Sequence, residues 1–156
     1  MQRRAVLQFA LATASLGLSG GIARSADTYP FALTDDAWRA RLSPAAYAVL
    51  RDAGTESAGS SPLDKEKRDG MFHCAGCDQA VYSSAHKFNS GTGWPSFWQA
   101  VQGATGTQSD RGLFGTRTEE HCRNCGGHLG HVFDDGPAPT GKRHCINGVA
   151  LSFKPA

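Results

Sequence analysis

Two pairs of cysteines with the same short spacing are separated by 44 residues in this sequence of 156. Cys74 and Cys77 form one C-x2-C pair, and Cys122 and Cys125 form the other. This spacing lets two thiolates on one tight turn face the same cation, and four thiolates make the closed tetrahedral set of a structural zinc ion. Two disulfide bridges are the alternative, which an oxidising compartment would favour. Because bridges within C-x2-C pairs are more typical of redox sites than of structural crosslinks, the sequence favours zinc.

The fifth cysteine, Cys145, has no such partner. A solitary cysteine is most often a small buried hydrophobe. Arg143 lies two residues before it and Asn147 two residues after it, so in a β-strand the three side chains would share one face. A guanidinium beside the sulfur favours the thiolate, which is the form that attacks. We therefore interpret Cys145 as a nucleophile.

Four further side chains could serve such a nucleophile. His128 and His131 lie in the glycine-rich segment GGHLGHVFDD and are candidates for general acid and base, although H-x2-H could also chelate a metal. Asp135 could orient a histidine or pair with Arg143. Trp94, in SGTGWPSFW, belongs by default to the core. Beside a nucleophile, its indole face could instead enclose a small apolar group such as a methyl.

These residues must be positioned mainly by β-structure. Thr34 and Ser43-Pro44 are N-cap signals that predict two short helices, the second running to Gly54. Residues 55–70 are polar and predict a surface loop. Short apolar runs between glycine-rich turns then predict an antiparallel sheet structure. The expected strands lie within residues 71–75, 80–84, 112–120, 127–135 and 144–153.

The first 25 residues have the plan of a secretory signal. Arg3 and Arg4 precede an apolar stretch at residues 5–18, and small residues follow. Paired arginines predict the twin-arginine route, and the apolar stretch is shorter than the roughly 20 residues that span a bilayer. We therefore expect residues 1–25 to be a signal peptide and the mature protein to be periplasmic, without stable membrane association. An uncleaved membrane anchor and a transit peptide are the alternatives.

Composition limits the partners. Residues 1–25 hold three of the 16 basic residues and none of the 14 acidic ones, so the remaining chain has a formal charge of −1. Without a basic surplus we expect no nucleic-acid partner. The length and the 40% apolar content suit one modest domain.

The motifs CAGC, SGTGWPSFW and CRNCGGHLGHVFDDGPAPTGKRHCIN, taken together and in this order, resemble those of the methionine-R-sulfoxide reductases. The resemblance covers residues 34–154, which we expect to form the reductase domain after the signal peptide and a short segment at residues 26–33. It implies a mainly β fold of two antiparallel sheets, described as a tent, with short N-terminal helices and one zinc ion. Enzymes of this class restore oxidised methionine, one enzyme for each sulfoxide epimer.

The resemblance also implies a role for each site residue. Cys145 would attack the sulfoxide sulfur and become a sulfenic acid, while His131, with His128 and Asn147, protonates the departing oxygen. Trp94 would enclose the substrate's S-methyl group. Arg143 and Asp135 match further positions of the family's active-site motifs. The zinc ligands implied by the family are Cys74, Cys77, Cys122 and Cys125.

The sequence departs from the family pattern at three positions. Many members have a resolving cysteine where this chain has Thr92. We therefore expect regeneration by an external, thioredoxin-like thiol. We also expect a monomer whose substrate is methionine sulfoxide in oxidised proteins, with free methionine sulfoxide as a further candidate substrate. His144 replaces the usual Tyr or Phe before the nucleophile, and Gly148 replaces a common Ser. A zinc-ribbon interaction module and a thiol peroxidase or disulfide exchanger are the rival functions, but the first leaves Cys145 unused and the second leaves the tryptophans unused.

Overall fold

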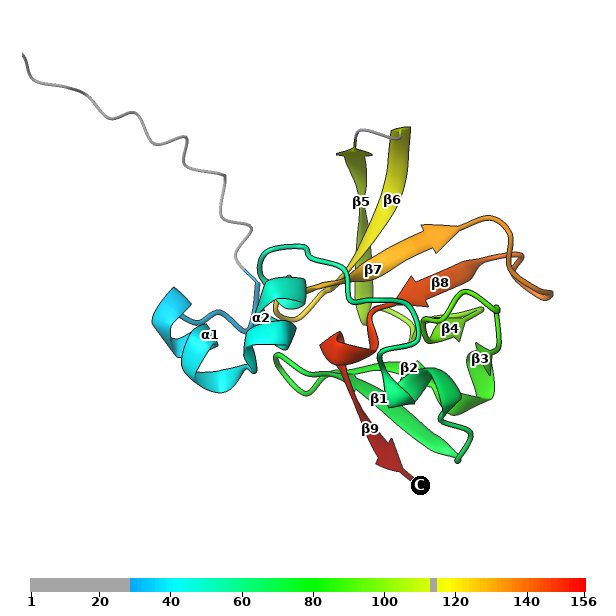
Figure 1. The fold of residues 1–156 in the computed structure, drawn as a ribbon, viewed down its shortest axis with the longest axis horizontal. Coiled ribbons are helices and arrows are strands. Elements are labelled where there is room, and N and C mark those ends of the chain that lie inside the picture. The colour runs from blue at the N-terminus through cyan, green and yellow to red at the C-terminus, as the bar shows by residue number, and fades with distance from the viewer. Residues whose placement is uncertain (1–28, 113–114) are drawn as a thin grey trace, which may run out of the picture.

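A computed structural model describes residues 29–112 and 115–156, so the expected signal peptide at residues 1–25 lies outside the described residues. Two helices, α1 (Asp35–Arg41) and α2 (Pro44–Leu50), come first and lie together at one end of the molecule (Figure 1). The strands are β1 (Gly70–Cys74), β2 (Ala80–Ser83), β3 (Lys87–Phe88), β4 (Ser96–Phe97), β5 (Thr105–Gly112), β6 (Gly115–Cys122), β7 (His128–Phe133), β8 (Arg143–Ile146) and β9 (Leu151–Pro155). Short 3-10 helices lie at η1 (Pro62–Lys65), η2 (Ser84–His86) and η3 (Gly148–Ala150). None of the helices in the described ranges has the length and hydropathy that a membrane span requires.

The two helices begin where the sequence predicts. The Thr34 hydroxyl accepts from the Ala37 N–H at 3.3 Å, and the Ser43 hydroxyl accepts from the Ala46 N–H at 3.2 Å. The second helix ends at Leu50 and not at Gly54 as predicted. The chain turns there because Ala53 takes a left-handed conformation and the Gly54 N–H donates back to the helix.

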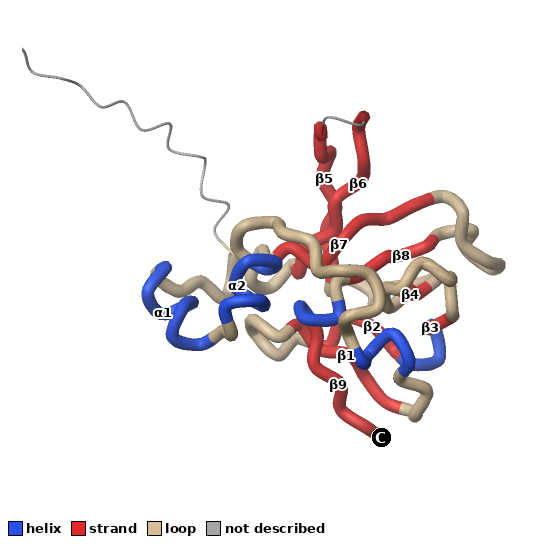
Figure 2. Tube along the Cα trace, viewed as in Figure 1, coloured by secondary structure: helices blue, strands red, loops and turns tan. Residues whose placement is uncertain are grey.

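The strands form two antiparallel sheets, as predicted. The smaller has the order β2-β1-β9 and the larger the order β3-β4-β8-β7-β6-β5. The strand expected at residues 144–153 is divided at Asn147, so that β8 lies in the larger sheet and β9 in the smaller. Sequence analysis missed β5 because its residues are polar and mostly exposed. The strand predicted at 112–120 includes the last residue of β5, part of β6, and residues 113–114, which lie outside the described residues. The outer parts of β5 and β6 project from the body (Figures 1 and 2).

The core joins the two sheets through aromatic rings. Phe72 of β1 and Tyr82 of β2 meet Phe97 of β4 with ring centroids 5.0 Å and 4.4 Å away, respectively. All three side chains are fully buried. Contacts of this kind add to the free energy of burying the rings and fix how the sheets face each other.

Candidate active site and metal site

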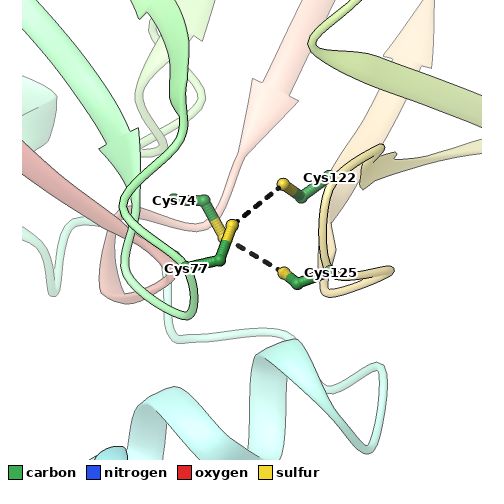
Figure 3. Close-up of side chains that lie close together, drawn as sticks. All are labelled: Cys74, Cys77, Cys122 and Cys125. Carbon is green, nitrogen blue, oxygen red and sulfur yellow. Dashed lines mark hydrogen bonds between the residues drawn. The ribbon is translucent and has the colours of Figure 1, made fainter. Parts of the chain in front are cut away.

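The four paired cysteines meet at one place, which we call the four-cysteine cluster (Figure 3). Their sulfur atoms all lie within 4.8 Å of one another. The sulfurs of Cys74 and Cys125 are 3.7 Å apart, and those of Cys77 and Cys122 are 3.6 Å apart. A zinc ion with Zn–S bonds of about 2.3 Å requires sulfurs about 3.8 Å apart at the corners of a tetrahedron. The cluster therefore fits a metal ion of this size, and none of the five cysteines takes part in a disulfide.

Two turns of the same form build the cluster. In each turn the residue after the second cysteine, Asp78 or Gly126, is left-handed and donates its N–H to the carbonyl of the first cysteine at 2.8 Å. One turn follows β1 of the smaller sheet and the other follows β6 of the larger sheet. The cluster thus lies where the two sheets meet and contains two cysteines from each. The neighbouring thiols, Cys122 most of all, hold the pKa of Cys77 far below its ordinary value.

Cys145 lies near the centre of the larger sheet. In β8 it is opposite His131 of β7 on one side and Ser96 of β4 on the other. Opposed residues of antiparallel strands present their side chains on the same face. A cavity of about 140 Å³ opens on this face, and its lining residues are Thr55, Trp94, Arg117, Gly130, His131, Phe133, Cys145 and Asn147. Because pockets for drug-sized ligands occupy roughly 300–1,000 Å³, this one suits a single small side chain.

An irregularity in β7 brings the two histidines together. His131 pairs with Glu119 and His128 pairs with His121, so Leu129 is an extra residue without a partner on β6. In a regular strand, residues three apart point to opposite faces, whereas one bulged residue restores the same face. The histidine rings lie 5.4 Å apart, edge to face. His131 lines the cavity, and His128 lies behind it.

Each histidine has a carboxylate partner. The Nε2 atom of His131 is 2.9 Å from the Asp110 carboxylate, and the Nδ1 atom of His128 is 2.8 Å from the Glu119 carboxylate. The hydrogen bond from His131 is the main cause that lowers the pKa of Asp110. Burial raises the pKa of Glu119, but hydrogen bonds from Gln108 and His128 outweigh it, so the pKa is lowered. Both carboxylates are therefore ionised acceptors, and the facing ring nitrogens carry the protons.

Burial favours the neutral form of both reactive groups, Cys145 and His131. Desolvation raises the pKa of Cys145, and it is opposed by hydrogen bonding of the thiolate form to Thr92 and by the charge of Arg143. Desolvation also lowers the pKa of His131, against the Asp110 carboxylate. Arg143 lowers the pKa of Cys145, the direction expected from the sequence, but burial outweighs it. The net shifts favour the thiol form of Cys145 and the neutral form of His131.

Asp135 pairs with Arg143, which was one of its two expected roles. The guanidinium donates two hydrogen bonds of 2.8 Å to the carboxylate and covers the Phe133 ring at 4.3 Å. This pair holds Arg143 on the face of β8 that carries Cys145, while Asp135 itself lies outside the cavity.

A single loop residue holds Trp94 and Asn147 in place. The carbonyl of Glu56 accepts from the Trp94 indole N–H at 3.1 Å, and its N–H donates to the Asn147 Oδ1 at 2.9 Å. Its carboxylate accepts from the N–H groups of Gly148 and Val149. The Asn147 Nδ2 atom donates one hydrogen to a main-chain carbonyl and keeps a second. The expected polar surface loop is therefore part of the site.

Neither of the two residues that depart from the family pattern near Cys145 lines the cavity. His144 bonds through Nδ1 to the fully buried Glu120 carboxylate at 2.8 Å, on the opposite face of β8. A Cβ atom on Gly148 would overlap the Ser61 hydroxyl. Gly148 is thus the residue that lets η3 pack against the loop, and a serine there would require the loop to move.

A larger cavity of about 700 Å³ lies between α2, η1 and β9. It is mainly apolar, and Glu56 is the one charged residue of its lining. Since main-chain N–H groups already occupy that carboxylate, this cavity offers no reactive group. The smaller cavity at Cys145 is the candidate active site.

Sequence analysis missed several residues of this site, namely Thr55, Glu56, Asp110, Arg117 and Glu119. A signal for two of them was present, since Arg117 and Glu119 alternate with uncharged or buried positions along β6. Charges with a period of two indicate one polar face of a strand. No comparable signal marks the others, because β5 and the loop before η1 have no apolar pattern.

Comparisons with known proteins identify the family of this chain. The family model described as the SelR domain matches residues 42–155. A curated peptide methionine sulfoxide reductase MsrB of Thioalkalivibrio sulfidiphilus is 50% identical over 128 residues, covering 81% of this chain and 93% of that protein. The MsrB of Methanosarcina barkeri is 48% identical over 122 residues, covering 78% and 86%. A solved Mis18 "Yippee-like" domain covers 57% of this chain and 98% of its own at a TM-score of 0.47 and 18% identity, too distant to support an argument.

Proposed function

Since this chain belongs to the SelR-domain family, whose curated members are peptide methionine sulfoxide reductases, we propose that it reduces the R epimer of methionine sulfoxide in oxidised proteins to methionine. The reaction class follows from the family. The choice of epimer and the role of each residue are the proposal, and the observation that carries them is the cavity shared by Cys145, His131, Trp94 and Asn147.

The chemical step transfers one oxygen atom. The Cys145 sulfur attacks the sulfoxide sulfur, and the oxygen moves to Cys145 as its bond to the methionine sulfur breaks. The transient bond between the two sulfurs then breaks, which releases methionine and leaves Cys145 as a sulfenic acid. The cysteine sulfur loses two electrons and the methionine sulfur gains them. The thiol proton supplies the hydrogen of the sulfenic acid, so atoms and charge balance. His131 donates from Nε2 to the sulfoxide oxygen once that oxygen displaces Asp110, and His128 supports its orientation.

Binding selects the epimer. The Trp94 indole, held by the Glu56 carbonyl, encloses the S-methyl group, and the second Nδ2 hydrogen of Asn147 donates to the sulfoxide oxygen. With both groups fixed, the lone pair and the oxygen of the sulfoxide have defined places, so the S epimer would turn its oxygen away from His131. Arg143, held by Asp135, stabilises developing negative charge on Cys145.

Regeneration requires an external thiol. The four cysteines other than Cys145 form the four-cysteine cluster, and the side chain at the resolving position is Thr92, whose hydroxyl lies 3.9 Å from the Cys145 sulfur. One external thiol condenses with the sulfenic acid to give a mixed disulfide and water, and a second thiol releases Cys145. A thioredoxin-like protein provides both thiols in one partner.

We also propose that the four-cysteine cluster holds one zinc ion. The sulfur separations fit tetrahedral thiolate coordination. When bound, zinc supplies structural crosslinking and no open coordination position. The cysteines of the cluster therefore hold β1 and β6 together and take no part in the reaction.

We further propose a role for the N-terminal segment and a monomeric state for the domain that follows it. Residues 1–25 direct export to the periplasm and are then removed, and residues 34–154 act as a monomeric reductase domain. Cell fractionation followed by N-terminal sequencing of the mature protein checks both the compartment and the cleavage position. An N-terminus at Met1 in a membrane fraction would support the uncleaved anchor.

The decisive experiment uses separated R and S epimers of a blocked methionine sulfoxide, with free methionine sulfoxide beside them, zinc-loaded full-length protein and excess dithiothreitol. Turnover of the R epimer alone, absent in Cys145→Ser, is the expected result. Reduction of both epimers would refute the proposed selection by Trp94. No turnover by folded, zinc-loaded protein would refute the reductase function.

A further inference from the structure

A chain of hydroxyl groups runs from the nucleophile into the protein. The Thr92 hydroxyl is 3.9 Å from the Cys145 sulfur and 2.8 Å from the Ser90 hydroxyl. Ser90 in turn is 2.7 Å from the hydroxyl of Ser96, which is fully buried. The Ser96 hydroxyl lies 3.1 Å from the Trp94 carbonyl oxygen and donates to it. The proposed reaction does not use this chain.

The number of hydroxyl hydrogens determines which group donates and which accepts along this chain. Each hydroxyl has one hydrogen to donate. Because Ser96 gives its hydrogen to the Trp94 carbonyl, it must accept from Ser90, and Ser90 must then accept from Thr92. The hydrogen of Thr92 is thereby used, so Thr92 can only accept from Cys145. The chain therefore holds Cys145 as a thiol whose S–H points at Thr92.

We propose that Thr92 is a catalytic residue that accepts the S–H of Cys145 in the resting protein and rotates to donate to the sulfur when the thiolate forms, with Ser90 and Ser96 opposing that rotation. The proposal deepens the proposed reductase mechanism and rests on it. The chain ends on a peptide carbonyl, which takes up no proton, so the thiol proton leaves through the cavity toward the sulfoxide oxygen. The hydrogen bonds of the hydroxyl chain can reverse their direction, but the chain does not conduct the thiol proton away from Cys145.

Changing Thr92 from acceptor to donor costs free energy, because the Ser90 hydroxyl already accepts its hydrogen. For Thr92 to donate to a thiolate, either Ser90 and Ser96 also reverse and the Trp94 carbonyl loses its donor, or the Thr92 and Ser90 oxygens face each other without a hydrogen between them. Each outcome removes one hydrogen bond from a chain whose inner end, Ser96, is fully buried and whose other two residues are half-buried. Without the Ser90 hydroxyl, Thr92 is free to donate to the sulfur at once.

Charged and titratable groups also face Cys145 and must stay constant in a test. Arg143 lies on the same strand, His131 lies opposite on β7, and Arg117 lines the cavity from β6. Asp110 reaches His131 from β5, and Asp135 follows β7 and holds Arg143. The adjacent strand β4 contributes Ser96 and no charge at this register. The burial that raises the pKa of Cys145 agrees with a resting thiol.

The test measures the pH dependence of Cys145 alkylation by iodoacetamide in the zinc-loaded full-length protein, followed by mass spectrometry of the Cys145 peptide. Thr92→Val keeps the side-chain shape and removes the hydroxyl, so the alkylation midpoint should rise and the rate at pH 7.5 should fall roughly tenfold, the size of a lost hydrogen bond to a charged group. Ser90→Ala should move the midpoint the opposite way, downward, and raise that rate severalfold. Thr92→Ser should restore the wild-type profile.

The opposite signs separate this role from a structural one. Thr107→Val, which removes an exposed hydroxyl on β5 at the far edge of the sheet, is the matched control and should leave the midpoint in place. Midpoint shifts of the same sign in Thr92→Val and Ser90→Ala, or no shift in either, would overturn the proposal. Alkylation requires no sulfoxide, so a wild-type protein that failed to reduce methionine sulfoxide would refute the reductase function without affecting this result.

Discussion

The four-cysteine cluster and the Cys145 pocket both contain cysteine thiols, but the groups that surround these thiols differ. In the cluster, each thiol has three other thiols as neighbours, and two turns of the same form present them. In the pocket, one thiol is surrounded by a hydroxyl, a guanidinium and an imidazole that come from different strands and loops. Among other thiols, a cysteine sulfur can serve as a metal ligand. Alone and partly buried, it is held neutral but remains accessible for attack.

The comparison also separates what stabilises the protein from what makes it reactive. The cluster joins β1 of one sheet to β6 of the other, so its loss should affect folding. The pocket lies within one sheet and has a core of aromatic rings behind it. Changes there should affect rates while leaving stability nearly unchanged.

The largest effect should come from breaking the cluster. Cys122→Ser should lose the bound zinc and with it a large part of a coordination free energy of about 10 kcal/mol, seen as a fall of the melting temperature by more than about 10 °C. The matched change Cys145→Ser should retain zinc and shift stability by no more than about 1 kcal/mol. Metal analysis and calorimetry check both. A Cys122→Ser protein with full zinc content and unchanged melting would contradict the cluster's structural role.

A smaller effect should follow from removing the proton donor of the pocket. His131→Gln should lower kcat/KM by roughly 10² to 10³, the usual contribution of general acid catalysis. Asp110→Asn should lower it about tenfold, because the amide no longer favours the proton on Nε2 of His131. Steady-state kinetics on the R epimer measures both effects. Asp134→Asn, which removes a surface carboxylate paired with Lys142, is the control, and an equal loss in that variant would contradict the role of Asp110.

The pH profile should reflect the two neutral groups of the pocket. The pKa of His131 is lowered and that of Cys145 is raised. The product of thiolate and imidazolium populations is constant between the two values, so kcat/KM should be flat near neutrality. At pH values below the pKa of His131, kcat/KM should fall because thiolate is lost. At pH values above the pKa of Cys145, it should fall because imidazolium is lost. A rise through pH 8 to 9 with no plateau below would indicate that burial does not govern Cys145.

The smallest effect should come from the loop that supports the pocket. Glu56→Gln keeps one carbonyl oxygen for the N–H groups of η3 but loses the charge, so the free energy of unfolding should fall by about 1–2 kcal/mol. KM should rise a few-fold because Trp94 and Asn147 are less firmly held. Denaturant titration and kinetics measure the two effects. Zinc content should not change, and its loss would show that loop and cluster are not independent.

Local sequence determined those features whose partners are near in the chain. Thr34 and Ser43 cap their helices because a hydroxyl reaches an N–H three residues on. Each C-x2-C turn brings two thiols together regardless of the rest of the fold. Alternating apolar residues gave the mainly β class, which the two sheets confirm. The polar strand β5 and the break of the last predicted strand at Asn147 escaped detection, because neither has a pattern in the nearby residues.

Tertiary structure decided the composition of the pocket. The bulge at Leu129 turns His128 and His131 to one face, which their spacing in a regular strand would not do. Glu56 reaches Asn147 across 91 positions of the chain, and Asp110 reaches His131 across 21. Sequence spacing determines contacts only where the backbone between two residues is short and its conformation is known. The partners of Cys145 come from separate strands and a loop, so pairing register and packing chose them.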